Sequence, residues 1–331
     1  MDTIFYITCA LVIIALIFDF TNGFHDAANS IATVVATKTL TPLQAVCMAA
    51  FFNFIVMFFI TLKVAATMGK GIITPEAITL QVVFGCLMGA ITWNMITWYL
   101  AMPTSSSHAL IGGLIGAAVP SFGTGAVLPG FYPILAFIIV APMIGFILGA
   151  GIHTAMRNMF PKDTPITNKW FKRLQLVSAA CYSMGHGAND AQKTAGIIFL
   201  ILIAGGYLTK EDAIPMWVVF VSFTVMGLGT LAGGWKIVQT LGFKLTSLNC
   251  KQGFCAEAGG SGMLFVASAV GIPVSTTHTI TGAILGVGAS EPEPKVKWKK
   301  ARDIVVAWIL TIPCSALLAY AFWFLAMEFT V

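Results

Sequence analysis

Long apolar segments constrain what this chain can fold into more than any other feature of its sequence. Six of them approach or exceed the roughly 20 residues that a helix needs to cross a bilayer, at 4–18, 43–62, 78–102, 131–152, 216–231 and 304–327. Charged residues make up only 9% of the 331 residues, against about a quarter in an ordinary soluble domain. A soluble chain of this size could not bury so much apolar surface in its own core. We therefore predict an all-α polytopic membrane protein.

The placement of basic residues predicts how the chain is oriented. Lysine and arginine gather at 157–173 and at 295–302, whereas 71–154 contains neither. Such residues prefer the cytoplasmic ends of spans, so we expect both clusters on the cytoplasmic side. In a soluble protein the same runs would suggest nucleic-acid binding. Beside so many apolar segments, we expect a lipid bilayer as the partner and no nucleic acid.

Two short motifs occur twice, in the same order. The sequence GFHDAANS at 23–30 matches GANDAQKT at 187–194, and PTSSSH at 103–108 matches PVSTTH at 273–278. The copies are separated by 164 residues in the first pair and by 170 in the second. One such match could arise by chance, but two in register indicate an internal duplication.

The charges of equivalent loops indicate that the two copies have opposite orientations. The segment 120–130 has no basic residue, but its counterpart 291–302 has five, and only the first copy ends in a basic cluster. Equivalent loops on opposite sides are typical of an inverted-topology repeat. One pair of segments disagrees, because Lys63 and Lys70 are matched by Lys236, Lys244 and Lys251. We predict about 10–12 membrane helices, some of half length, in an N-terminal repeat 1–152, a basic cytoplasmic connector 153–173 and a C-terminal repeat 174–331.

Four ionisable residues lie in or beside apolar segments: Asp26, Asp190, Lys193 and Glu257. Each would cost about 2.5–3.5 kcal/mol at the centre of a bilayer, so we expect all four to face a polar interior. A Lys–Asp pair that only ties helices together is the structural alternative. Two acids at equivalent positions of the copies favour a functional role instead. For Glu257 three roles stay open: a gate, a proton acceptor, or a partner of Lys251.

The hydroxyl motifs predict two helix starts inside the membrane. Proline ends the preceding segment, and serine or threonine caps the helix that follows. A helix start leaves backbone N–H groups free to bind an anion, and inverted repeats aim two such starts at one point near the midplane. Hydroxyls that merely satisfy the backbone of a kinked helix are the alternative. The predicted anion-binding residues are Thr104, Ser105, Ser106, Ser107, Ser275, Thr276 and Thr277.

Neither catalysis nor a bound metal is predicted. The pairs Ser107-His108 and Thr277-His278 are sequence neighbours, and neighbours on a helix do not face each other as nucleophile and base must. No two histidines have the i, i+4 spacing of a zinc-binding helix, and the seven cysteines form no ligand pattern. We expect a protein that is not an enzyme and has no cofactor.

Together these motifs resemble the PiT family of inorganic phosphate transporters, over residues 19–286. The family signature is close to Gly-Ala-Asn-Asp-x-Ala-Asn-Ser/Ala; here His25 replaces the first asparagine in one copy, and Gln192 and Lys193 replace Ala-Asn in the other. These variants are similar to bacterial low-affinity phosphate permeases. The resemblance implies an alternating-access phosphate symporter of the bacterial cytoplasmic membrane, with re-entrant half-helix hairpins that carry the hydroxyl motifs. Whether it forms a homo-oligomer stays open.

The resemblance also implies roles for individual residues. Residues that would line the coupling-ion sites are Asp26, Asn29, Asn189 and Asp190, and the hydroxyl residues would hold phosphate. Lys193 departs from this pattern, because an ammonium group has no lone pair with which to bind sodium. We expect Lys193 to neutralise Asp190 or the anion, and coupling to fall to a proton shared by Asp26, His25 and the substrate.

The sequence leaves several functions open besides a proton-coupled symporter. They are a sodium-coupled phosphate symporter, a sulfate permease, a passive anion channel, and transport of phosphate as a neutral complex with a divalent metal. A carboxylate in the pocket can only accept hydrogen bonds, which favours protonated phosphate over sulfate.

Overall fold

The computed structural model describes residues 2–328, which form twelve α-helices and no β-strand. The first six are α1 (Asp2–Ala36), α2 (Pro42–Ile55), α3 (Lys63–Lys70), α4 (Leu80–Tyr99), α5 (Ser106–Phe122) and α6 (Phe131–Met159). The second six are α7 (Pro165–Ala204), α8 (Met216–Ala232), α9 (Trp235–Gln239), α10 (Cys250–Val270), α11 (Thr276–Ala289) and α12 (Trp298–Glu328). A π-helical turn, η4 (Thr240–Lys244), continues α9.

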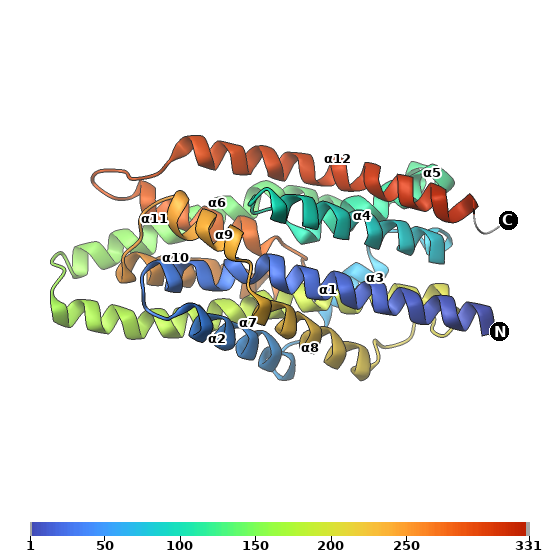
Figure 1. Cartoon of the computed structure of the whole chain (residues 1–331), viewed down its shortest axis with the longest axis horizontal. Helices are drawn as coiled ribbons and strands as arrows, with labels where there is room; N and C mark the ends of the chain where they lie inside the picture. Colours follow the sequence, from blue (N-terminus) through green and yellow to red (C-terminus); the bar gives the residue numbers. More distant parts are fainter. Residues whose placement is uncertain (1, 329–331) are drawn as a thin grey trace.

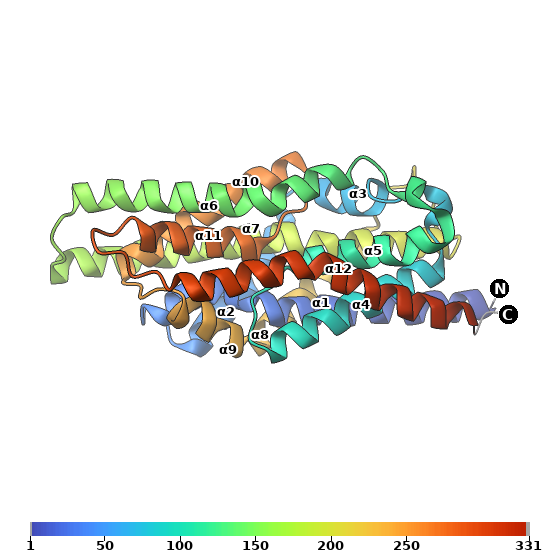
Figure 2. The same ribbon diagram turned by 90° about the horizontal axis from the view of Figure 1, so that it is seen from above.

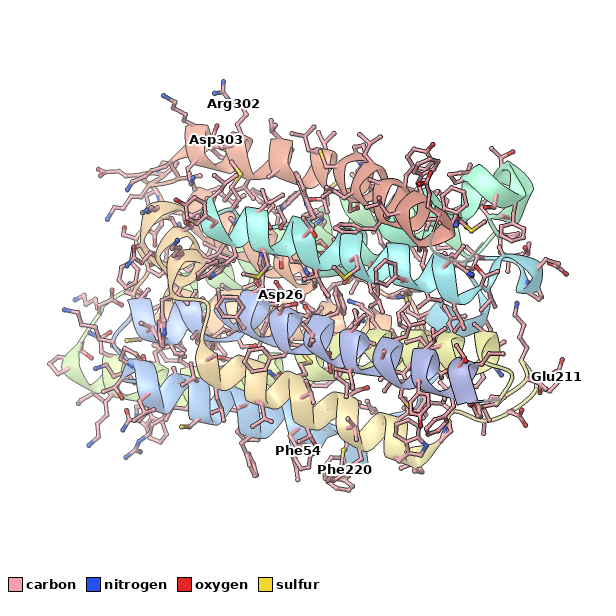
Figure 3. All side chains as sticks on the ribbon, turned by 45° about the vertical axis from the view of Figure 1, so that its right-hand side comes forward. Asp26, Phe54, Glu211, Phe220, Arg302 and Asp303 are labelled. Carbon is pink, nitrogen blue, oxygen red and sulfur yellow. The ribbon has the colours of Figure 1, made fainter. Side chains whose placement is uncertain are left out.

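Five of these helices are long and apolar enough to cross a membrane: α1, α4, α6, α10 and α12. Two bent pairs raise the number to seven, since α2 turns by 83° into α3, and α8 by 62° into the segment formed by α9 and η4. Charged residues such as Glu211 and Arg302 lie at the two ends of the bundle, while Phe54 and Phe220 face outward along its side (Figure 3). The prediction of an all-helical membrane protein is confirmed.

The two halves run in opposite directions. In Figure 1, α1 and α7 cross the bundle from opposite ends, and Figure 2 shows the same relation for α6 and α12. The contacts repeat with the halves exchanged: α1 packs on α8 as α7 packs on α2, and α12 packs on α4 and α5 as α6 packs on α10 and α11. This is the inverted arrangement that the loop charges predicted.

Equivalent glycines allow close contact between these helices. A Cβ atom at Gly23 of α1 would meet the backbone of Met226 in α8, and one at Gly187 of α7 would meet the backbone of Asn53 in α2. The glycine three residues before each signature aspartate, Asp26 or Asp190, therefore has a packing role. It brings the helix that carries this aspartate within backbone contact of a neighbour. We call these two helices, α1 and α7, the signature helices.

Both basic clusters lie at one end of the molecule, as predicted. The Lys251 ammonium is 2.6 Å from Asp163 in the α6–α7 connection, and Arg157 donates a 2.7 Å hydrogen bond to the Ser290 carbonyl at the end of α11. The segment 153–173 is the end of α6, a short turn and the beginning of α7. The repeat boundaries themselves stay a prediction.

Four of the five lysines that disagreed with the charge pattern, Lys63, Lys70, Lys236 and Lys244, have a structural explanation, whereas Lys251 lies in α10. Lys63 begins α3 and Lys236 lies in α9, the short helices that follow the two bends. They belong to broken spans rather than to connections between spans. Their charge therefore does not report which side of the membrane a loop occupies.

Candidate functional site

The two hydroxyl motifs begin α5 and α11, and their first serines cap these helices. The Ser105 hydroxyl accepts a 3.2 Å hydrogen bond from the backbone N–H of His108, and Ser275 accepts the same bond from His278. Thr104 donates to Thr97 at 2.9 Å. These three hydroxyls position the helix starts, and the remaining four hydroxyl residues reach the signature helices.

In the first copy, Asp26 of α1 contacts both hydroxyl motifs and Asn29 contacts the second. Ser106 donates to Asp26 at 2.8 Å, and Thr277 of the other motif donates at 3.4 Å. The Asn29 amide donates to Thr277 at 2.9 Å and to Thr276 at 3.2 Å. Residues as many as 251 positions apart in the sequence therefore meet at α1, as the duplicated motifs predicted.

The second copy repeats these contacts from α7. Thr276 donates to Asp190 at 3.0 Å, as Ser106 does to Asp26. Lys193 stands where Asn29 stands in the first copy, and its ammonium donates at 2.5 Å to the Ser107 hydroxyl of the opposite motif. The same ammonium lies 2.5 Å from Asp190 and 2.7 Å from the Val274 carbonyl. Three oxygen atoms thus surround it.

This cluster is closed to the surroundings. Asp26, Asp190 and Lys193 are each no more than 2% exposed, and Asp26 lies in the middle of the bundle (Figure 3). Charges buried to this degree are tolerated only when they are paired and hydrogen-bonded. The Lys193 ammonium and the hydroxyl groups provide that compensation.

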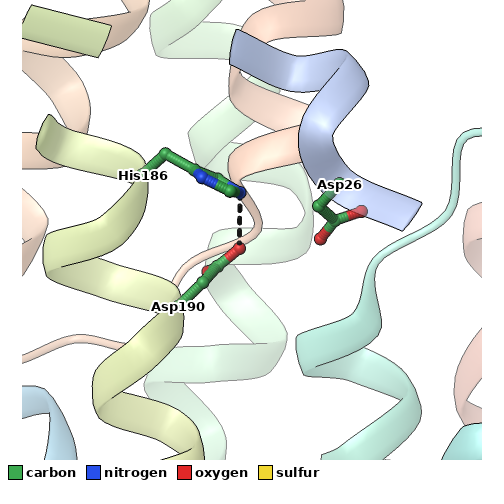
Figure 4. Close-up of side chains that lie close together, drawn as sticks. All are labelled: Asp26, His186 and Asp190. Carbon is green, nitrogen blue, oxygen red and sulfur yellow. Dashed lines mark ion pairs between the residues drawn. The ribbon is translucent and has the colours of Figure 1, made fainter. Parts of the chain in front are cut away.

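Histidines flank both carboxylates. His25 Nδ1 lies 2.8 Å from Asp26 Oδ1, and His186 Nε2 lies 3.2 Å from Asp190 Oδ2. Figure 4 shows Asp26 facing the His186–Asp190 pair across the site. One ligand atom from each of these three residues lies within 4.8 Å of the others, a spacing that could hold a metal ion. His186 was not predicted from the sequence, although a histidine and an aspartate at i, i+4 spacing are a signal that could have found it.

Two further histidines meet where α5 and α11, the half-helices of the two repeats, begin. The rings of His108 and His278 are 4.8 Å apart, centroid to centroid, in an edge-to-face arrangement. His278 also stacks on Trp308 of α12 at 3.9 Å, and the Trp308 indole donates to the Pro103 carbonyl at 2.9 Å. Both helix starts are thereby packed together and tied to α12.

Not every predicted residue joins the cluster. The Asn189 side chain holds the loop before α11, since its oxygen accepts from the Val274 N–H at 3.2 Å. Glu257 lies apart and accepts from Ser178 at 2.5 Å and from Gln175 at 3.1 Å. Lys251 pairs with Asp163 instead. The suggested pairing of Glu257 with Lys251 is therefore wrong.

Two buried polar residues near the site were not anticipated. Asp19 is fully buried and accepts a 2.7 Å hydrogen bond from Thr194 of α7. The Tyr182 hydroxyl donates to the Thr276 carbonyl at 2.8 Å. Asp19 could have been found as an acid directly after the first apolar run, 4–18. Tyr182 carried no signal, since a tyrosine in an apolar segment is more often core.

The fold and the site together define a class of protein. Two inverted repeats whose broken helices converge on buried charges inside the bundle are typical of membrane transporters, and helix starts rich in hydroxyl groups suit an anion.

Comparison with known proteins identifies the family. The chain belongs to the phosphate transporter family, whose model matches residues 22–319. It is 51% identical to a "probable low-affinity inorganic phosphate transporter" of Rhizobium meliloti, over 97% of each chain. A Bacillus subtilis protein of the same description is 44% identical, over 99% of this chain and 100% of the relative. A solved structure, "the sodium-dependent phosphate transporter", has the same fold, with a TM-score of 0.87 and 23% identity over 98% of this chain and 100% of that chain.

These comparisons bear on the predictions made from the sequence. The predicted family is confirmed, as is an integral protein of a bacterial cytoplasmic membrane. The family consists of transporters and not enzymes, as expected. The roles assigned to individual residues stay predictions.

Proposed function

We propose that this chain carries inorganic phosphate together with protons by alternating access, with the Lys193 ammonium in the place of a coupling sodium ion. The observation that carries the proposal is the set of three oxygen atoms around that ammonium: Asp190 Oδ1, Ser107 Oγ and the Val274 carbonyl, at 2.5–2.7 Å. Oxygen atoms in such a set are the ligands that a hard cation prefers. A tethered cation therefore fills this position.

The charge balance of the site supports cotransport. When ionised, Asp26 and Asp190 carry two negative charges, and Lys193 supplies one positive charge. A phosphate anion adds further negative charge to a site that is almost completely buried. Uncompensated charge in a medium of low dielectric constant is costly. Additional positive charge must therefore enter with the anion, and protons can supply it.

His25 and Asp26 are the groups suited to take up that proton. Their side chains are 2.8 Å apart, and Ser106 and Thr277 also donate to Asp26. A neutral imidazole beside a buried carboxylate can share one proton with it. Arrival of the anion would draw the hydroxyl groups of Ser106, Thr276 and Thr277 away from the carboxylates, which then need the proton as compensation.

A divalent metal is a second way to supply positive charge. The cluster of Asp26, His186 and Asp190 provides three ligand atoms within 4.8 Å of one another, and carboxylates with imidazole suit several divalent ions. This favours a second candidate, in which phosphate travels as a neutral complex with such a metal. The metal would then be part of the substrate.

Labelled phosphate uptake into proteoliposomes tests the proposal. An inward proton gradient without sodium should drive uptake, and a sodium gradient at equal pH should not; uptake driven by sodium alone contradicts it. Dependence of that uptake on added magnesium, or cotransport of a labelled divalent metal, would support the metal complex.

The same vesicles distinguish the symporter from a sulfate permease and from a passive anion channel. Strong inhibition by excess sulfate would favour a sulfate permease. A channel could not accumulate phosphate against its electrochemical gradient, so accumulation of phosphate in the vesicles would exclude a passive channel.

A further inference from the structure

The two short helices that follow the bends share a motif that the transport site does not use. Lys63, Thr67 and Gly69 of α3 match Lys236, Thr240 and Gly242 of α9 and η4, each pair 173 residues apart. We call the segments Lys63–Lys70 and Trp235–Lys244 the straps. We call 271–275 and 101–105, the loops that lead into the hydroxyl helices α11 and α5, the tips.

Each strap threonine holds the tip of a hairpin from the other repeat. The Thr67 hydroxyl donates to the Gly271 carbonyl at 2.8 Å, and the Thr240 hydroxyl donates to the Ala101 carbonyl at 3.0 Å. Each threonine also has the carbonyl four residues earlier within reach, but farther away, at 3.1 and 3.4 Å. The bond to the tip is the shorter one in both straps.

The tips need such support because of their backbone conformation. Gly271 has φ of 87° and Ala101 has φ of 55°, so both occupy the left-handed region at the point where the outer helix of the hairpin ends. This region suits glycine, but it is strained for alanine. A hydrogen bond to the carbonyl of this residue fixes the direction in which the chain continues to the hydroxyl motif.

The strap lysines contact the same two hairpins. Lys63 donates at 2.9 Å to the Ala269 carbonyl in the last turn of α10. The Lys236 ammonium lies 4.5 Å from the ring centre of Tyr99, the last residue of α4. The C-terminal end of a helix carries partial negative charge, which favours a cation there. Both lysines therefore strengthen the attachment of the straps to the two hairpins.

The straps in turn are packed on the signature helices. A Cβ atom at Gly69 would meet Phe199 and Gly196 of α7, and one at Gly242 would meet Ala32 of α1. In the first strap, the Ala65 N–H also donates to Gln192, the neighbour of Lys193, at 3.1 Å. Each strap thus connects the helix that carries a signature aspartate with the tip that leads directly to the opposing hydroxyl residues.

We propose that Thr67 and Thr240, each with the lysine one turn before it, are positioning residues that hold the two hydroxyl-bearing tips in register with the signature helices. They act on the anion through the tips and do not touch it. This inference rests on the phosphate transport described above. It adds a device outside the site that sets the geometry of the site.

The test is the KM for phosphate uptake by Thr67→Val and Thr240→Val in proteoliposomes, with thermal unfolding of each purified variant. Valine keeps the shape and removes the donor, so KM should rise about five-fold in each, the factor expected for one lost hydrogen bond, with kcat less affected. Thr67→Ser and Thr240→Ser keep the donor and should restore KM to within about two-fold of the unmodified value. Thr224 is the matched control, since its hydroxyl donates to the carbonyl of Phe220 in its own helix, at 2.7 Å.

An unchanged KM in both valine variants overturns the proposal, as does an equal rise in Thr224→Val or a failure of serine to restore KM. If the valine variants do not fold, Lys63→Met and Lys236→Met replace them, and an unchanged KM in both then overturns it. Absence of uptake by the unmodified chain would instead contradict phosphate transport itself.

Discussion

His108 and His278, at equivalent positions of the two repeats, meet with their ring centroids 4.8 Å apart. The pair marks the axis that relates the repeats, because each residue lies three positions after the serine that caps its helix. Only His278 also stacks on Trp308, at 3.9 Å. The two halves are therefore alike in backbone but differ in what surrounds this pair.

Alanine substitutions at these histidines should differ in their effect on stability. His278→Ala should lower the free energy of unfolding by about 0.5–1.5 kcal/mol more than His108→Ala, because it also loses the aromatic stack. Thermal unfolding in detergent measures this, and in a Trp308→Leu background the difference should vanish. A larger effect at His108 would contradict the assignment.

The signature aspartates should be required for transport. Asp26→Asn and Asp190→Asn each lose a charged acceptor of hydroxyl hydrogen bonds, and a bond to a charged group contributes about 1.5–3 kcal/mol. Uptake should fall by about ten-fold or more while the proteins remain folded. Glu211→Gln, at an exposed end of the bundle, is the control (Figure 3). Normal uptake by both aspartate variants would refute the site.

Substitution of Lys193 should change the dependence on cations. Lys193→Met removes the ammonium that pairs with Asp190, and removing one partner of a buried pair costs about 3–5 kcal/mol, so uptake should be lost under all conditions. Lys193→Asn supplies an oxygen and vacates the cation position, so uptake should return when sodium is added. Lys169→Asn, at an exposed position of the same helix, should behave as the unmodified chain. Sodium-independent uptake by Lys193→Asn would contradict the tethered-cation role.

Glycines of the half-helices should tolerate no side chain. A Cβ atom at Gly116 would meet the backbone of Ala316, and one at Gly286 would meet the backbone of Phe146. Each Gly→Ala change should therefore cost about 1–3 kcal/mol of stability. Gly262 of α10 has open space around it, so Gly262→Ala should be neutral or stabilising by up to about 1 kcal/mol. Equal melting temperatures for all three variants would contradict the packing.

The sequence was most informative where it was repeated. Two motifs in register predicted the duplication, the charges of equivalent loops predicted that the halves are inverted, and inversion in turn predicted that the two hydroxyl-bearing helix starts converge on one point. The repeat also predicted that Lys193 and Asn29 are counterparts. These conclusions needed no knowledge of packing.

What the sequence did not reveal depends on tertiary contacts. The apolar run at 43–62 suggested one straight span, but the chain bends by 83° between α2 and α3. Helix α7 was not among the predicted long spans, because the polar residues of the site interrupt its apolar pattern. Thr67 and Thr240 look like ordinary helical threonines, and only their contacts with Gly271 and Ala101 give them a role.

The packing of α5 on α12, and of α11 on α6, gives the two repeats a relation like that of a domain-swapped dimer. Each half lends its re-entrant helix to the last helix of the other, with glycines removing the space between them. Neither half therefore has a complete hydrophobic interior of its own, and the bodies that move during transport must contain segments of both. Fragments cut in the α6–α7 connection should accordingly be stable only when they are produced together.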